Sequence, residues 1–486
     1  MISVVSPLAD IPIRIFTCQR YIPLEHFLSL KKNAMQKTKV PMEMINPQAA
    51  GIDIGSRSHF VSIGQRKEDV REFGVYNEDL KAIAAWLLDN GIKTVAMEST
   101  GTYWQSLFAV LQSTGLQVIL CNGKFTKNIK GKKTDVQDCQ WIQKLHTIGL
   151  LSGSFLPDKA TEQLRTYCRH RGNLLDNAAD TTRKMQKYLR LLNLRLDVVV
   201  KDITGLTGLA IIEAICKGEV NAQVLASLRH GNCKKSEEEI AKALQTNGRQ
   251  DYLFALKHEY QMYQSLQPAI TSCDVEIEKM LTEHINNNDD KRQHIIDKKI
   301  HKRINKNSPK NIDINLMAYQ YFEGVDMLAI EGVSHSTVLS IMSEVGLEGL
   351  KKFDTAKQFA SWLRLAPNNK ISGGKVLSHK VPKGSNRLKI ALRNAANAIG
   401  NLKDTPLSNF FSRINFRKGR VSAISATARK LAVIIWNMIV KKQPYNNQQG
   451  YEFLDQKRKR KVKEMRKLIH KFDITTNELG LHISGL

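Results

Sequence analysis

Four carboxylates in the first third of the chain have types and spacings that could support metal-assisted chemistry. Asp53 lies inside the β-rich run GIDIG between two isoleucines, so its side chain faces away from those apolar neighbours. Glu98 ends the apolar run VAMES, and Asp135 and Asp138 begin a helical pattern on one face of its first turn. Converging carboxylates need cations to offset their repulsion, and their oxygens suit Mg²⁺ or Mn²⁺. Two such ions can activate an attacking oxygen and stabilise a leaving one in phosphodiester chemistry.

Each acid also has a purely structural interpretation. Asp135 and Asp138 could favour the helix dipole at its positive end, with Thr134 as the cap. Glu98 could be a surface residue at the end of a strand. Asp53 is the least easily explained in this way, because charged residues are seldom placed inside an apolar strand.

A lysine-rich loop directly precedes the acidic pair. The run NGKFTKNIKGKKTD is where a phosphate backbone would lie if the acids bind metal. A solvated charged loop is the alternative. The lysines of this loop are Lys124, Lys127, Lys130, Lys132 and Lys133.

The pattern around the acids predicts a mixed sheet with helices. GIDIG, HFVSIGQ and VREFGVY are three β-rich runs that indicate an antiparallel meander. A helix capped by Asn77 and stopped by Gly91 follows, and TVAMES and LQVILCN alternate with helical patterns over 103–111 and 135–150. The order β-β-β-α-β-α-β-α is that of a ribonuclease H-like (RuvC-like) α/β domain, in which the fourth strand lies beside the first and brings Glu98 to Asp53.

The rest of the chain is predicted to be mainly helical. Long helical patterns flank a smaller helical insertion at about 201–250, which indicates a helical hairpin or coiled coil. The expected parts are an N-terminal extension (1–47), the RuvC-like domain (48–158), a helical or coiled-coil region (159–285), a basic linker or insert (286–325), a mainly helical C-terminal domain (326–440) and a basic tail (441–486).

A possible phosphate-binding turn lies in the C-terminal domain. LAIEGVSHSTVLSIMSEVG and KKFDTAKQFASWLRLAP read as short helices joined at a glycine-containing turn, similar to a helix-hairpin-helix. Backbone N–H groups around Gly332 could then bind a DNA phosphate at a helix N-terminus. An ordinary helical hairpin fits the pattern equally well.

Composition favours a polyanionic partner. The 486 residues carry 73 Lys and Arg against 46 Asp and Glu, a formal charge of +27, and nucleic acid is the first candidate. An anionic membrane is the competitor, but no uninterrupted run of about 18 apolar residues occurs and the N-terminus has no basic segment followed by an apolar one. The seven cysteines include no close C-x-x-C pair, which argues against a disulfide framework or a zinc ribbon. We therefore expect an intracellular protein.

Two blocks of sequence resemble a known family. GIDIGSRSHFVSI, AMESTGTYW, GKKTDVQDCQWIQKL and LPD resemble the N-terminal half of the DEDD insertion-sequence transposases, the "IS one-ten" group. Further along, IEGVSHSTVLSIMSEVG, FASWLRLAP, SGGK and KGSNRLKIALRNAA resemble the C-terminal transposase domain of that family, in the same order.

The resemblance implies a DNA transposase or recombinase with a two-domain active site. Asp53, Glu98, Asp135 and Asp138 would be catalytic acids that bind Mg²⁺ (or Mn²⁺), and Ser372 of the SGGK motif would attack the scissile phosphate to form a covalent protein–DNA intermediate. The resemblance also implies that the protein binds donor and target DNA and a structured noncoding bridge RNA. It further implies a homotetramer that is associated with the nucleoid in the cytoplasm of a prokaryotic cell.

The residues alone support the serine less strongly. A serine before two glycines is most often a turn residue, and the NNKI run before Ser372 is less serine-rich than is usual in the family, although Ser378 is a weaker candidate still. Lys375, Lys383 and Arg387 could hold a DNA backbone near it. Other functions stay open: a metal nuclease or junction resolvase that uses water, an inactive nucleic-acid-binding relic, or an actin-like ATPase, which would need a second Asp-Gly phosphate motif that we do not find.

Overall fold

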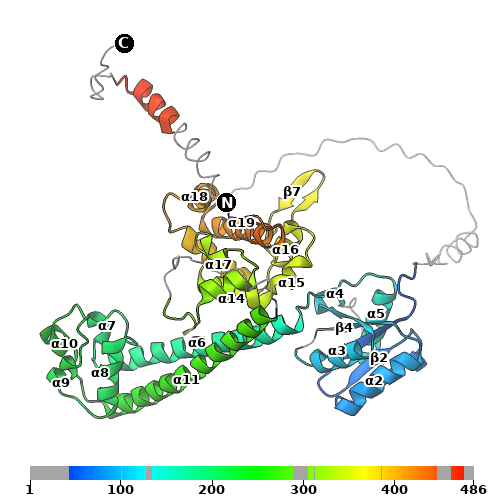
Figure 1. The fold of residues 1–486 in the computed structure, drawn as a ribbon, viewed down its shortest axis with the longest axis horizontal. Coiled ribbons are helices and arrows are strands. Elements are labelled where there is room, and N and C mark those ends of the chain that lie inside the picture. The colour runs from blue at the N-terminus through cyan, green and yellow to red at the C-terminus, as the bar shows by residue number, and fades with distance from the viewer. Residues whose placement is uncertain are drawn as a thin grey trace, which may run out of the picture. The chain divides into compact units, whose positions relative to one another are not determined.

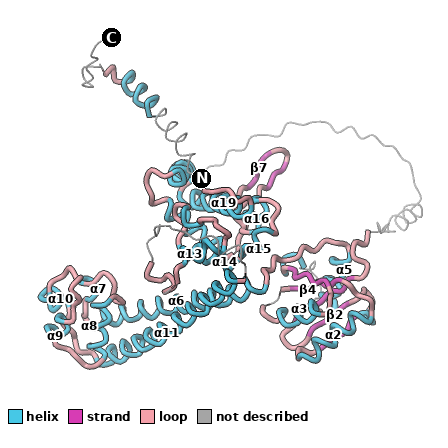
Figure 2. The backbone as a smooth tube through the Cα atoms, in the orientation of Figure 1, coloured by secondary structure: helices cyan, strands magenta, loops and turns pink. Residues whose placement is uncertain are grey.

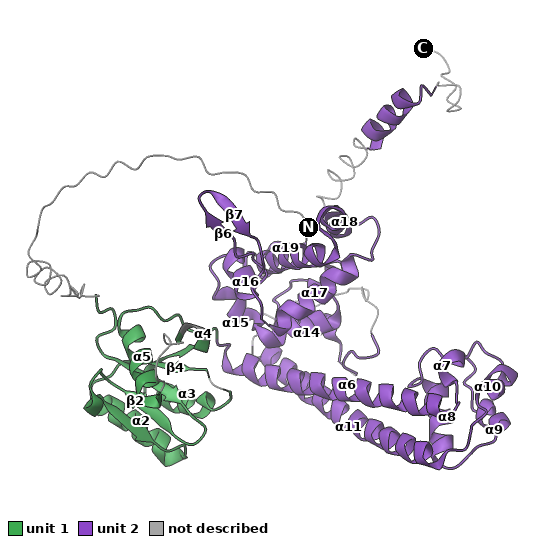
Figure 3. Cartoon of the chain, turned by 180° about the vertical axis from the view of Figure 1, so that it is seen from behind, with its two compact units in different colours: residues 1–155 green, residues 156–486 purple. Residues whose placement is uncertain are grey.

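The chain was analysed as a computed structural model, which describes residues 43–99, 101–126, 134–287, 305–310, 312–384, 386–445 and 461–474. Most of the expected N-terminal extension and parts of the basic insert and tail lie outside these residues. Figure 3 shows two compact units, residues 1–155 and 156–486, which we describe separately.

The first unit contains a five-stranded mixed sheet in the order β3-β2-β1-β4-β5. β1 (Ala49–Ile54) pairs antiparallel with β2 (His59–Ser62), which pairs antiparallel with β3 (Val70–Phe73) after the short η1 (Lys67–Asp69). On its other side β1 pairs in parallel with β4 (Thr94–Glu98), and β4 with β5 (Gln117–Cys121). This mixed sheet confirms the predicted ribonuclease H-like α/β arrangement.

Helices flank this sheet (Figure 1). The helices are α2 (Asn77–Asp89), α3 (Trp104–Ser113), α4 (Gly123–Thr126) and α5 (Asp135–Thr147), and α5 packs on β1, β2 and β4. The apolar faces of the strands and helices meet in a core in which Ile52, Val95 and Leu87 are fully buried. The predicted order of elements is therefore present, with the short helix α4 as an addition.

The predicted C-terminal stop of α2 is confirmed, whereas the predicted N-terminal cap is wrong by one residue. The helix begins at Asn77 itself, and the cap is Tyr76, whose backbone N–H donates to the Asp79 carboxylate at 3.0 Å. Asp79 thus does the capping that we expected from Asn77. Gly91 ends the helix as predicted, with a φ of 69° and an N–H that donates to Leu88 O at 2.9 Å.

In the second unit, two long helices pack side by side along their length (Figure 2). They are α6 (Lys159–Leu191) and α11 (Gln250–Asn286), the hairpin that the helical spacing indicated. Four short helices fill the connection between them, where residues such as Ile211, Leu225 and Leu244 form a separate apolar core with the ends of the long helices. These are α7 (Leu196–Val199), α8 (Leu206–Cys216), α9 (Ala222–Ser227) and α10 (Glu237–Ala243).

A buried ion pair joins the two long helices. Arg171 on α6 contacts Asp274 on α11, with side chains only 7% and 3% exposed. Arg171 also donates to Asn307 O at 3.0 Å, and Asp274 accepts the backbone N–H of Lys310 at 3.0 Å. The pair therefore holds the segment 305–310 against both helices.

The remaining residues form a helical bundle around α19 (Arg420–Val440), with one β-hairpin. α19 packs against helices α15 to α18, and it is long and apolar enough to cross a membrane by composition alone. Its buried Leu431 and Ile435 lie in the core of this bundle, which explains the apolar sequence. The other elements are α13 (Ile314–Tyr321), η2 (Met327–Ala329), α14 (His335–Glu344), α15 (Gly346–Lys351), α16 (Ala356–Trp362), β6 (Lys370–Ser372), β7 (Lys375–Ser378), α17 (Arg387–Ile399) and α18 (Pro406–Lys418).

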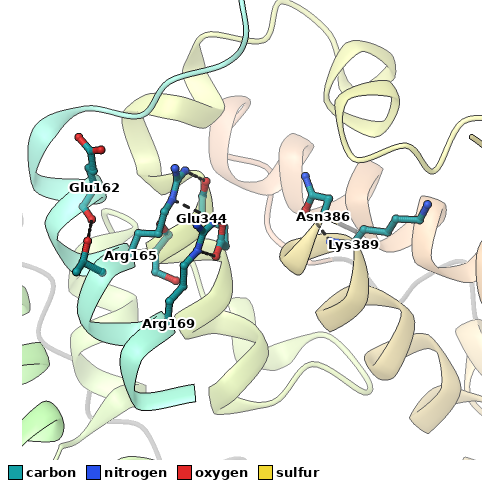
Figure 4. Close-up of polar contacts among 8 residues, drawn as sticks. Glu162, Arg165, Arg169, Glu344, Asn386 and Lys389 are labelled. Atoms are coloured by element: carbon teal, nitrogen blue, oxygen red, sulfur yellow. Dashed lines mark hydrogen bonds and ion pairs between the residues drawn. The ribbon is translucent and has the colours of Figure 1, made fainter. Parts of the chain in front are cut away.

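Glu344 connects this bundle to α6. Arg169 donates to both carboxylate oxygens of Glu344, at 2.9 and 2.7 Å, and this bidentate contact raises the pKa of Arg169. Arg165 donates to the backbone oxygens of Ser343 and Glu344 at 3.3 and 2.6 Å, which satisfies carbonyls at the C-terminal end of α14 (Figure 4). Both arginines therefore fix the end of α14 on one face of α6.

We expect Asp274→Ala to destabilise the second unit by about 3–5 kcal/mol, because the change leaves the Arg171 charge buried and unpaired. The measurement is the free energy of unfolding in urea. Asp251→Ala, which removes an exposed partner of Arg249, is the matched control and should leave stability nearly unchanged. Equal effects of the two substitutions would contradict the structural role of the buried pair.

Candidate active site

Asp53 and Glu98 lie side by side at the end of two parallel strands. Ile52 on β1 pairs with Met97 on β4, so the next residues, Asp53 and Glu98, hold matching positions on neighbouring strands. Residues in matching positions share a face of the sheet. The predicted approach of these two carboxylates therefore follows from the register of the sheet.

Helix α5 covers this face of the sheet at very short range. A Cβ at Gly51 would lie 2.2 Å from Gln143 N and 2.5 Å from Cys139 O, so only glycine permits the packing. Asp53 is two residues from Gly51 and so lies on the same face.

The direction of α5 brings its acidic first turn to the Asp53 end of β1. Gln143 donates to Ala49 O at 3.2 Å, and Ile45 N donates to Thr147 O at 2.9 Å further back along the chain. The helix therefore runs opposite to β1. The predicted cap is confirmed, because Thr134 accepts the N–H of Gln137 at 3.3 Å.

The pKa of the buried Cys139 thiol is affected by two of the acids. The pKa of Cys139 is raised to about 12, mainly by burial and in part by the negative charges of Asp53 and Asp138. Both carboxylates thus lie within electrostatic reach of one thiol on the inner face of α5.

Glu98 is held by α4, a contact that the sequence analysis missed. The Thr126 hydroxyl donates to Glu98 Oε2 at 2.5 Å, and a Cβ at Gly123 would lie 2.3 Å from Glu98 Oε1. Gly123 before the lysine-rich loop was the signal available in the sequence, because a glycine there allows close approach to a neighbouring group.

The four acids are not gathered into a ready ligand set. Asp135 is exposed, whereas Asp138 is half-buried. Within the described ranges, no three His, Cys, Asp or Glu side chains lie close enough together to hold a metal ion. The repulsion between like charges favours this separation, and Thr126 directs one oxygen of Glu98 toward α4.

Ser372 lies at the tip of the β6–β7 hairpin, in the second unit. It pairs with Lys375, and the two residues between them, Gly373 and Gly374, have φ values of 53° and 74°. Positive φ at both central positions defines a two-residue type I′ turn, for which glycine is favoured. Ser372 is exposed there, so the expected turn is confirmed and its hydroxyl is open to solvent.

Two basic residues hold the segment that follows the hairpin. Arg364, which has a φ of 54°, donates to Lys383 O at 2.6 Å, and the buried Lys389 donates to Pro382 O at 3.2 Å. Burial lowers the pKa of Lys389, as do the charges of nearby arginines. The sequence analysis missed both anchors. The predicted phosphate contacts Lys375, Lys383 and Arg387 are exposed.

Gly332 has a structural explanation of its own. Its φ is 74°, and a Cβ would lie 2.8 Å from Ala395 O on α17. The turn therefore needs glycine for packing, and the phosphate contact stays a prediction. Of the lysine-rich loop, Lys127, Lys130, Lys132, Lys133 and the side chain of Lys124 lie outside the described residues.

Gly51→Ala should destabilise the first unit by about 1–3 kcal/mol, since the added methyl would overlap the backbone of α5. Thermal unfolding of the variant is the measurement. In the same unit, Gly153→Ala is the control, because the nearest atom to its added methyl is Ile119 Cβ at 3.7 Å. A Gly51→Ala variant as stable as the control would show that α5 does not pack so closely.

Comparison with known proteins gives two matches in the order of the sequence blocks. Residues 50–193 match the family model of DEDD transposases of the IS110 type, described as "Transposase". Residues 327–411 match the model described as "Transposase IS116/IS110/IS902 family". The search of curated proteins gave no match. The first segment contains the four acids and the second contains Ser372, and the chain belongs to the IS110 family of insertion-sequence transposases.

Proposed function

We propose that this transposase cuts and rejoins DNA by phosphodiester transesterification, with Ser372 as nucleophile and the four acids as ligands of a divalent metal. The observation that carries the proposal is the matching position of Asp53 and Glu98 beneath α5, within the segment that matches the DEDD transposases. Two adjacent carboxylates on an otherwise apolar strand pair are best explained by a cation that they share.

The donor set fits Mg²⁺, or Mn²⁺ in its place. Asp53 and Glu98 supply neighbouring hard oxygens, and Asp138 approaches the same thiol as Asp53. Asp53, Glu98, Asp135 and Asp138 would hold the metal, which when bound supplies positive charge at the reacting oxygens. Thr126 would orient Glu98 through its hydrogen bond.

Ser372 would carry the covalent step. A bond forms between its Oγ and phosphorus while the bond from phosphorus to the leaving strand end breaks; the serine releases a proton, and the leaving oxygen takes one up. The hydroxyl of another strand end then attacks the same phosphorus and releases Ser372. Each step exchanges one phosphate ester for another, so the chemistry needs no external energy source.

The hairpin suits this role because its tip is exposed while the segment that follows it is held by hydrogen bonds. The exposed Lys375 and Lys383 would neutralise the phosphates of the bound strand. Arg364 and Lys389 would act as positioning residues, since they hold the backbone that follows the hairpin.

We also propose that a structured bridge RNA pairs with donor and target DNA. The protein would act as a homotetramer with a composite active site, in association with the nucleoid. The net charge of +27 supports a large polyanionic partner. A water-using metal nuclease is the second candidate. Among the described residues no side chain hydrogen-bonds to Ser372, and this favours the nuclease because nucleophilic serines usually need a neighbouring base.

Metal binding predicts a stabilisation that depends on the acids. Mg²⁺ or Mn²⁺ at about 100 times its dissociation constant should stabilise the chain by about 2.7 kcal/mol in thermal or chemical unfolding. Asp53→Asn and Glu98→Gln should lose this gain. Glu72→Gln, at an exposed position on β3, is the control and should keep it. Equal gains in all four proteins would place the metal elsewhere.

The serine mechanism predicts a protease-sensitive protein–DNA adduct. With the RNA that flanks the element, donor and target DNA and Mg²⁺, Ser372→Ala should reduce adduct formation by on the order of a thousandfold or more. Asp53→Ala should reduce it similarly, whereas Ser378→Ala should still form it. If Ser372→Ala still cleaves DNA and Asp53→Ala does not, water is the nucleophile and the second candidate is correct.

A further inference from the structure

The corner between α18 and α19 carries an aromatic ring in the solvent. Phe416, near the end of α18, is 92% exposed, the largest value of any large hydrophobic residue in the part of the chain that the structure describes. Val421, at the start of α19, is 71% exposed. Gly419, with a φ of 77°, turns the chain between them. The ring therefore offers a flat apolar face to a partner.

The two helices that meet at this corner carry basic side chains but no acidic ones. Neither Asp nor Glu occurs between Pro406 and Val440. Because neither helix supplies an acid, the positive potential at the corner is not offset within this segment. The basic residues of the segment are Arg413, Arg417, Lys418, Arg420, Arg429 and Lys430, and the first four are exposed.

Two of the cations share the face of α18 that presents the ring. Arg413 is three residues before Phe416 and four before Arg417, spacings that place neighbours on one helix face. Arg417 donates to Arg413 O at 3.3 Å and so lies along the helix.

Arg420 is fixed on the other side of the turn. It donates to the side-chain oxygens of Asn397 at 2.8 Å and Asn401 at 3.0 Å, and its guanidinium lies 5.5 Å from the ring centre of Phe411. These partners orient the guanidinium, and because they are uncharged they do not neutralise its positive charge.

We propose that the α18–α19 corner binds an unpaired nucleotide of a polynucleotide strand. The base stacks on Phe416, and the flanking phosphates pair with Arg413, Arg417 and Lys418. In a duplex the ring could reach a base face only by unstacking a base step, whereas an unpaired base offers its face without that cost. Stacking and backbone charge together give tight binding with little sequence preference.

Two other partners fit this corner less well. A membrane would need a broad apolar face. Leu431 and Ile435 of α19 are 0% exposed in the helical core and cannot contribute to such a face, whereas Phe416 and Val421 are exposed at the corner. A second copy meeting the corner about a two-fold axis would bring the basic side chains of the two copies together, and like charges repel.

The corner shares no residue with the proposed catalytic set of Ser372 and the four carboxylates. Binding can therefore be measured without divalent metal and without cleavage, and failure of the catalytic proposal would leave this one standing. A displaced DNA strand and a loop of RNA both present an unpaired base between phosphates. The experiment uses both, so that the source is identified.

The test is fluorescence anisotropy of the full chain with labelled oligo(dT), oligo(U) and an abasic strand of equal length and charge. Phe416→Ala should weaken binding of the base-containing strands about tenfold and leave the abasic affinity unchanged, because only stacking is lost. Phe416→Trp should retain binding. Phe254→Ala removes another exposed ring, 65% exposed on α11, and should have no effect. A larger loss with oligo(U) identifies RNA as the source, and a larger loss with oligo(dT) identifies DNA.

Photocrosslinking gives a second readout. A strand that contains 5-iodouracil should crosslink to Phe416, as located by mass spectrometry. Unchanged affinity of Phe416→Ala together with a crosslink map that omits the corner would overturn the proposal. An equal loss of affinity for abasic and base-containing strands would also overturn it. The same holds if Phe416 affects binding to phosphatidylserine vesicles, or dimer formation in sedimentation, without affecting stacking.

Discussion

The candidate metal site depends on the close packing of α5 on β1. Gly51 has no side chain, so the backbone at Cys139 and Gln143 can lie directly over the strand. Gln143 then donates to Ala49 O and fixes the direction of the helix against the strand. Because α5 runs opposite to β1, its acidic first turn reaches the end of the strand that carries Asp53. The glycine therefore determines which acids can share a cation.

The second unit presents the proposed nucleophile at the exposed tip of a hairpin. The hairpin that carries Ser372 is open at its turn, while Arg364 and Lys389 hold the backbone that follows it. The bundle beneath the hairpin is fixed in turn to α6 through Glu344 and its two arginines. An exposed tip and a hydrogen-bonded following segment thus occur together, an arrangement that would suit the proposed nucleophile.

Much of the first unit follows from local patterns in the sequence. The β-rich runs located the strands, and the ribonuclease H-like order, which places the fourth strand beside the first, predicted the approach of Asp53 and Glu98. The contact of Thr126 with Glu98 could not be found in this way, because it depends on how a four-residue helix folds back over the sheet. For the same reason the anchors of the hairpin were missed, since each is a cation that contacts a carbonyl several residues away. At α2 the carboxylate of Asp79 displaced Asn77 as the capping group, a competition between neighbours that composition alone does not decide.

The central claim is that Asp53 and Glu98 share a metal ion beneath α5, and diffraction from crystals of the full chain soaked in Mn²⁺ tests it most directly. The account predicts an anomalous difference peak between these two carboxylates, with Asp138 drawn toward it. A peak elsewhere, or none at Mn²⁺ concentrations that support DNA cleavage, would contradict the claim and leave the acids as structural residues.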